Sequence, residues 1–133
     1  MKLYHGSPKK LKELVPNQAK GLGEFQNQKA VFLTDSFDRA SLYSFGKFLK
    51  GKTAFGLTTK NNLIVLGNYK LPDKSYVYEV NVDGKKENPK SHEYAFDKPI
   101  KKFILHQVKL EDYQKFIQYA KSEKDFCEKF KNP

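Results

Sequence analysis

The sequence predicts an α+β protein with a mostly antiparallel sheet, folded as a single domain over residues 1–133. Three observations predict this class. The chain is long enough for one hydrophobic core and too short for two ordinary domains. Runs with the character of strands outnumber those with the character of helices. The two kinds do not alternate as regular strand–helix–strand units, which a doubly wound parallel sheet would require.

The N-terminal quarter is predicted to hold two strands separated by a long loop. Residues 2–4 form a short strand, and residues 8–16 hold a helical turn that ends at a proline. Residues 17–29 are polar, contain glycine and show no period, which is typical of a loop; long loops in compact domains are often functional. The apolar run at 30–34 predicts a buried strand.

A helix is predicted directly after the second strand. Asp35 or Ser36 caps its N-terminus, Asp38 lies favourably in its first turn, and Gly51 follows its end. It carries five side chains at roughly helical spacing, which are Phe37, Ala40, Ser41, Tyr43 and Phe48.

The rest of the chain is predicted to be strands, followed by helical structure at the C-terminus. Alternation is clearest around Tyr76, Tyr78, Val80 and Val82, which share one face. An amphipathic helix or pair of turns is expected over residues 111–130. The predicted strands are 53–58, 63–66, 75–83, 92–96 and 100–110.

The formal net charge of +10 predicts attraction to polyanions, and nucleic acid is the usual candidate. Arg39 is the only arginine, whereas bidentate recognition of guanine or phosphate typically uses arginine. A lysine surface is therefore also explained by composition and solubility. Both explanations stay open.

Cys127 is the only cysteine, so no internal disulfide can form, and no metal-ligand spacing is present. The N-terminus lacks the apolar run of a signal peptide, and no apolar stretch is long enough to span a membrane. We expect a cytoplasmic protein without a membrane partner, or one that acts in a host or target cell. The sequence does not predict the oligomeric state.

Common catalytic motifs are absent: the chain has no P-loop, G-x-G-x-x-G, H-E-x-x-H or G-x-S-x-G. A serine hydrolase is therefore not expected. An ordered set of polar and aromatic residues is present instead. "YHGS" ends the first strand, "AVFLTDSFDRASLY" places Tyr43 eleven residues after Phe32, and "HEYAF" carries Glu93 on a late strand.

These stretches resemble the ADP-ribosyltransferase superfamily, in particular the His-Tyr-Glu branch that includes diphtheria toxin and the poly(ADP-ribose) polymerases. The resemblance implies a split antiparallel β-sandwich with a helix after the second strand and a C-terminal helix. It implies an NAD-dependent mono-ADP-ribosyltransferase, a glycosyltransferase that releases nicotinamide. NAD is its substrate, and no metal is required. Small members of this kind occur as bacterial toxins, antibiotic-modifying enzymes and phage factors.

The resemblance also implies how NAD is held. The Gly6 backbone binds the nicotinamide carboxamide, because a ligand can closely approach a residue without a side chain. His5 binds the adenosine ribose hydroxyls, and Ser7 binds the nicotinamide side. Phe32 and Tyr43 stack on the nicotinamide ring and its ribose. Polymerases have a tyrosine where this chain has Phe32, so a hydroxyl contact is lost while the stack survives.

Glu93 is the implied chemical residue, acting with His5 and Tyr43 as the catalytic set. A carboxylate near the ribose stabilises the oxocarbenium-like charge that develops as the glycosidic bond breaks. The loop at 17–29 is expected to close over the pyrophosphate, with Lys20 and Lys29 as phosphate contacts.

The acceptor is unknown: a protein, a nucleic acid or a small molecule each fits. Two alternatives use the same fold, an NAD glycohydrolase with water as acceptor and a non-catalytic module that binds ADP-ribose or nucleic acid. Arginine-modifying relatives carry an acidic residue or glutamine where Ser91 stands, which argues against arginine as acceptor. Taken singly, Phe32 and Tyr43 also fit core aromatics, and Glu93 also fits an exposed strand charge.

Overall fold

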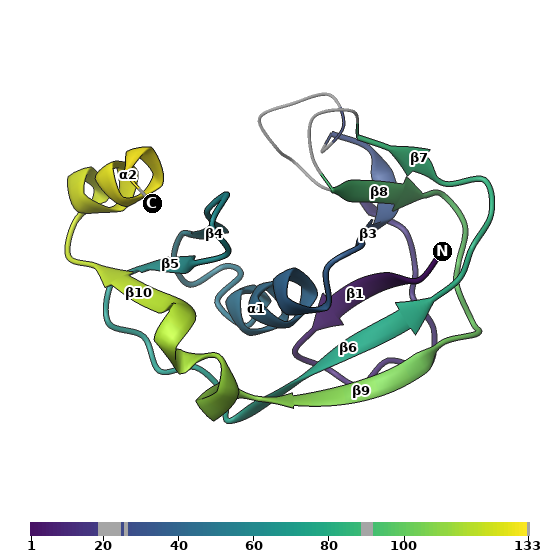
Figure 1. Cartoon of the computed structure of the whole chain (residues 1–133), viewed down its shortest axis with the longest axis horizontal. Helices are drawn as coiled ribbons and strands as arrows, with labels where there is room; N and C mark the ends of the chain where they lie inside the picture. Colours follow the sequence, from purple (N-terminus) through teal and green to yellow (C-terminus); the bar gives the residue numbers. More distant parts are fainter. Residues whose placement is uncertain (19–24, 26, 89–91, 133) are drawn as a thin grey trace.

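The computed structural model describes residues 1–18, 25, 27–88 and 92–132. Within these residues the chain forms two α-helices and ten strands in two sheets. Figure 1 shows how the labelled elements are arranged. The predicted α+β class with a mostly antiparallel sheet is confirmed. None of the helices in this part of the chain is long and apolar enough to cross a membrane.

The larger sheet has seven strands and is antiparallel throughout. Its order is β7-β8-β3-β1-β6-β9, and β2 pairs separately with β3. The strands are β1 (Leu3–Ser7), β2 (Asn17–Gln18), β3 (Lys29–Thr34), β6 (Lys74–Val80), β7 (Lys86–Glu87), β8 (Glu93–Phe96) and β9 (Ile104–Lys109).

The smaller sheet has the order β10-β5-β4, formed by β4 (Phe55–Leu57), β5 (Leu63–Leu66) and β10 (Ile117–Ala120). β10 runs parallel to β5, with Ile117 opposite Leu63. Because β5 is almost wholly buried, both of its edges need hydrogen-bonding partners, and β10 covers the edge that β4 leaves open.

The amphipathic helix or pair of turns predicted over residues 111–130 is only partly correct, because strand β10 lies within this segment. Two short 3₁₀ turns, η1 (Leu110–Asp112) and η2 (Gln114–Phe116), precede β10, and a shorter helix, α2 (Glu123–Lys131), follows it. Ser122 starts α2, because its side chain accepts a hydrogen bond from the Asp125 N–H at 3.2 Å.

The helical turn predicted over residues 8–16 is wrong. Leu14 instead forms a backbone bridge with Ile100, with N···O distances of 2.9 and 2.8 Å. The Leu11 N–H donates to the Tyr78 hydroxyl at 2.7 Å. These long-range partners take the backbone groups that a helix would have paired locally.

Helix α1 (Phe37–Lys47) lies between the two sheets and contacts strands in both (Figure 1). Ser36 is its N-cap, since its side chain accepts from the Arg39 N–H at 3.2 Å, as one of the two predicted caps. Two of the side chains at helical spacing lie outside the core. Tyr43 is 44% exposed and Phe48 is 37% exposed, while Leu42 and Phe45 are buried.

The two hydrophobic clusters share strand β6. Val77 belongs to the cluster around α1, and Tyr78 belongs to the cluster with Leu3 and Val31. Successive side chains of a strand point to opposite faces, so a strand covered on both sides contributes alternately to two cores. β6 is therefore buried almost throughout, rather than on one face as its alternation predicted.

Candidate functional site

The candidate site lies where β1 and β3 separate. β1 is paired with β6 at all five of its residues, from Leu3↔Val80 to Ser7↔Tyr76. Its register with β3 is limited to Tyr4↔Thr34. The last part of β1, which contains the predicted residues His5, Gly6 and Ser7, therefore runs beyond its pairing with β3.

His5 bridges the two separating strands. Its Nδ1 lies 2.8 Å from the Phe32 carbonyl oxygen. Burial, followed by the positive charge of Lys47, lowers the pKa of His5 to about 3, so the ring is neutral near pH 7. A carbonyl can only accept, so Nδ1 carries the proton and Nε2 is left as an acceptor. An acceptor at Nε2 suits a ligand hydroxyl, as predicted for a ribose.

Gly6 is needed for a reason that the sequence did not predict. A Cβ at this position would lie 2.1 Å from the Ala40 carbonyl oxygen of α1. The missing side chain thus lets the helix approach β1. The Gly6 carbonyl is itself engaged, because the Lys47 ammonium donates to it at 2.6 Å.

Lys47 is the residue of this site that the sequence analysis missed. It lies in the last turn of α1, partly buried, and its Nζ is 5.9 Å from the centre of the Tyr43 ring. Burial, followed by the charge of Lys50, lowers the pKa of Lys47 to about 8. The available signal was its spacing: residues four apart on a helix share a face, so Lys47 belongs beside Tyr43.

The two predicted stacking aromatics lie on different elements, and each contacts another ring. Phe25 packs edge-on against Phe32 with centroids 6.2 Å apart. Phe55 packs edge-on against Tyr43, also at 6.2 Å. Tyr43 is exposed, whereas Phe32 is partly buried, so Tyr43 is the more accessible surface for a ligand ring.

Glu93 begins β8, opposite Thr34 of β3. Its charge reaches the site: partial burial, and then the negative charge of Glu93, raise the pKa of the Tyr43 phenol, while the positive charge of Arg39 lowers it. Arg39 is held by the Thr58 carbonyl at 3.0 Å and the Asn61 side chain at 2.8 Å. The fold thus brings Glu93 and Tyr43, fifty positions apart in the chain, within electrostatic reach.

The remaining predicted contacts are less central. The Ser7 hydroxyl accepts from the Lys9 N–H at 3.2 Å, which stabilises the turn after β1. Lys29 is exposed at the start of β3, opposite Gln18. Lys20 lies outside the described residues.

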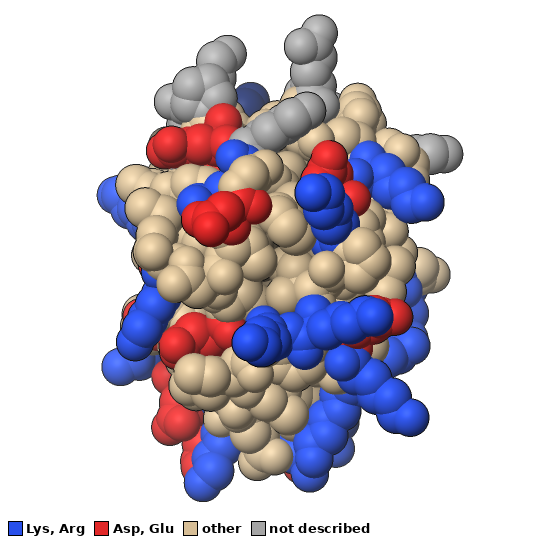
Figure 2. Space-filling view, turned by 90° about the vertical axis from the view of Figure 1, so that its right-hand side faces the viewer, with Lys and Arg blue, Asp and Glu red and all other residues tan. Residues whose placement is uncertain are grey.

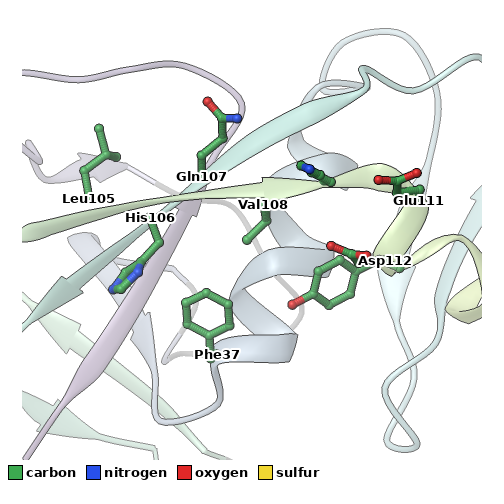
Figure 3. Close-up of a pocket in the computed structure, with 9 residues that line it drawn as sticks. Phe37, Leu105, His106, Gln107, Val108, Glu111 and Asp112 are labelled. Atoms are coloured by element: carbon green, nitrogen blue, oxygen red, sulfur yellow. The ribbon is translucent and has the colours of Figure 1, made fainter.

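A separate hollow lies beside β9 and the first 3₁₀ turn (Figure 3). Its volume is about 530 Å³, and Phe37, His106 and Asp112 are among its lining residues. His106 is held there by Glu79 at 3.1 Å and by an edge-on contact with Phe37. No predicted site residue lines this hollow, so it is distinct from the separation of β1 and β3.

The charges on the face in Figure 2 are mixed. Lysine side chains are spread over it, with acidic side chains and uncharged surface between them. A nucleic-acid interface usually gathers its basic residues into a patch or stripe. This face thus offers no such stripe to the predicted nucleic-acid partner.

No protein-family model, curated protein or solved structure matches this chain. The residues around the separation of β1 and β3 are therefore the only indication of function among the described residues.

Proposed function

We propose that this protein is an NAD-dependent ADP-ribosyltransferase whose site lies where β1 and β3 separate. The observation that carries the proposal is the 2.8 Å hydrogen bond from His5 Nδ1 to the Phe32 carbonyl, which leaves Nε2 of a neutral imidazole as an acceptor at this separation. Glu93 supports the proposal, because partial burial and then its negative charge raise the pKa of the Tyr43 phenol.

Each residue has a role in the proposed reaction. Nicotinamide leaves with the electrons of the glycosidic bond, and positive charge develops on the ribose. The Glu93 carboxylate stabilises that charge and orients the ribose hydroxyl. Tyr43, with its exposed ring, stacks on the nicotinamide end. Nε2 of His5 accepts a hydrogen bond from the adenosine ribose.

The test is nicotinamide release from NAD, followed by mass spectrometry. Glu93→Gln keeps the shape of the side chain and removes its charge, and we expect release to fall at least about 100-fold. Glu128→Gln is the matched control, because Glu128 is exposed on α2. We expect it to release nicotinamide at the wild-type rate, and thermal melting checks that both variants are folded.

Release that is equal in Glu93→Gln and wild type would refute the role of Glu93. If purified protein alone releases nothing, the assay is repeated with labelled NAD in a cell lysate, since transfer requires an acceptor. The label then distinguishes the alternatives: a labelled macromolecule or small adduct indicates transfer, and free ADP-ribose indicates hydrolysis. Absence of both, with NAD bound, indicates a binding module.

A further inference from the structure

Lys47 places a positive charge at the candidate site without a negative partner. Among the described residues no carboxylate forms an ion pair with it. Its ammonium is instead bonded to the Gly6 carbonyl at 2.6 Å and lies beside the Tyr43 ring. A carbonyl and an aromatic face compensate a partly buried charge only in part, whereas an anionic ligand would compensate it fully.

The hydrogen bond from Lys47 to the Gly6 carbonyl also changes which ligand groups the Gly6 backbone can bind. A carboxamide head group needs an acceptor for its N–H₂, and the expected acceptor is the Gly6 carbonyl. That oxygen is already paired with an ammonium, whose charge repels a second N–H donor. The ammonium carries two further N–H bonds, which are donors. The group it suits has only acceptors, such as a carboxylate.

The neighbouring Tyr43 ring further restricts the class of ligand that fits this position. The Tyr43 ring is exposed and lies within cation–π distance of the Lys47 Nζ. A flat aromatic ring that carries a carboxylate could stack on Tyr43 while its carboxylate pairs with Lys47. In the proposed reaction, the ligand that fits this description is a dinucleotide whose pyridine ring carries a carboxylate in place of the carboxamide of NAD.

We infer that Lys47 is a specificity-determining residue that makes the site prefer a pyridine carboxylate, as in the nicotinate form of the dinucleotide, over the carboxamide of NAD. This inference rests on the proposed function, because it assigns the head-group end of the same site. It differs from the implied binding of a carboxamide by the Gly6 backbone alone.

The test is calorimetric binding of NAD, its nicotinate analogue and ADP-ribose to the full-length protein. Lys47→Met keeps the length of the side chain and removes its charge. Lys50→Met is the matched control, because Lys50 is an exposed lysine just beyond the same helix. Thermal melting of all three proteins verifies the fold, and Lys47→Gln provides a second, polar variant if Lys47→Met does not fold.

We expect wild type and Lys50→Met to bind the nicotinate analogue about tenfold or more tightly than NAD, as for one added charge-assisted hydrogen bond. We expect Lys47→Met to lose this preference while its affinity for ADP-ribose stays the same. An equal loss for ADP-ribose would overturn the inference, because Lys47 would then hold a phosphate. A nicotinate preference that survives in Lys47→Met would also overturn the inference, because the preference would then come from the net positive charge of the protein rather than from Lys47.

Failure of the inference and failure of the proposed function are distinguishable. If wild type binds NAD as tightly as the nicotinate analogue, and Lys47→Met leaves the ratio unchanged, the inference is wrong and the transferase proposal stands. If wild type binds none of the three nucleotides, both are wrong.

Discussion

The two edges of β1 differ in what they contribute. On one edge, the strand pairs with β6 along its whole length, and the Tyr78 ring and hydroxyl lie in a buried cluster. On the other edge, pairing with β3 is limited to Tyr4↔Thr34, and beyond it lie the contacts of His5 and Gly6 with Phe32 and Lys47. One strand thus has an edge held by a continuous ladder and an edge where hydrogen bonds that involve side chains replace the ladder.

This difference explains how β1 can leave its pairing with β3 with little loss in the free energy of unfolding. Polar groups can be left for a ligand only where the rest of the strand is held firmly. The β6 ladder and the packing of α1 hold β1, so the β3 edge can separate. Substitutions where β1 packs against β6 or the backbone of α1 should change stability, and those of side chains at the separation of β1 and β3, including the exposed Tyr43, should change binding.

The largest effect is expected at Gly6, where the strand meets the helix. Gly6→Ala places a Cβ 2.1 Å from the Ala40 carbonyl, so α1 must shift, and we expect a loss of about 3 kcal/mol or more in the free energy of unfolding. Urea denaturation measures it. Gly84→Ala is the control: its φ of 81° costs about 1–2 kcal/mol but nothing lies near its added Cβ. Equal losses would contradict the close approach.

The second-largest expected effect is the pH dependence of the unfolding free energy that His5 causes. Its folded pKa of about 3 lies below the ordinary value of 6.5, so the unfolded chain binds a proton between these values and the folded protein does not. Stability is therefore highest above about pH 6.5 and falls as the pH decreases toward 3.

We expect His5→Gln to remove about 2–3 kcal/mol of the stability difference between about pH 7 and pH 4.5. Denaturation at both pH values gives this number, and His92→Gln, at an exposed histidine, controls for the loss of an imidazole. Parallel pH profiles for wild type and His5→Gln would mean that the imidazole is not held neutral.

A smaller effect on the unfolding free energy is expected at Tyr78, which lies on β6, the strand that pairs with β1 along its whole length. Its hydroxyl accepts from the Leu11 N–H and donates to the Lys9 carbonyl, both at 2.7 Å. Tyr78→Phe removes both bonds, and we expect a loss of about 1–2 kcal/mol in unfolding free energy with unchanged nucleotide affinity. A selective loss of affinity at full stability would place Tyr78 in the site.

The smallest effect on stability is expected at Tyr43. Its ring is 44% exposed, so Tyr43→Ala should cost less than about 1 kcal/mol in unfolding free energy. Loss of one stacking surface should weaken nucleotide binding by about 1 kcal/mol, roughly fivefold, measured by calorimetry. A variant that loses stability but binds normally would contradict the placement of Tyr43 in the site.

Local signals predicted most of the elements correctly. The apolar run before Asp35 gave β3, Ser36 capped α1, and alternation located β6, because short-range sterics and side-chain capping act within a few residues. The predictions failed where distant partners compete with local preference. Leu14 pairs with Ile100 rather than within a helical turn, and Ile117 joins β5 as a parallel strand.

The candidate site was likewise predictable from the sequence only in part. The sequence by itself determined the residue types and their order: a histidine and a glycine on the first strand, an aromatic and a tyrosine eleven residues apart, and a late glutamate. Only the tertiary structure decided that β1 and β3 separate, that Glu93 influences Tyr43, and that Lys47 reaches Gly6 across forty-one positions. These contacts depend on how α1 packs between two sheets, and packing between distant segments leaves no periodic signal in the chain.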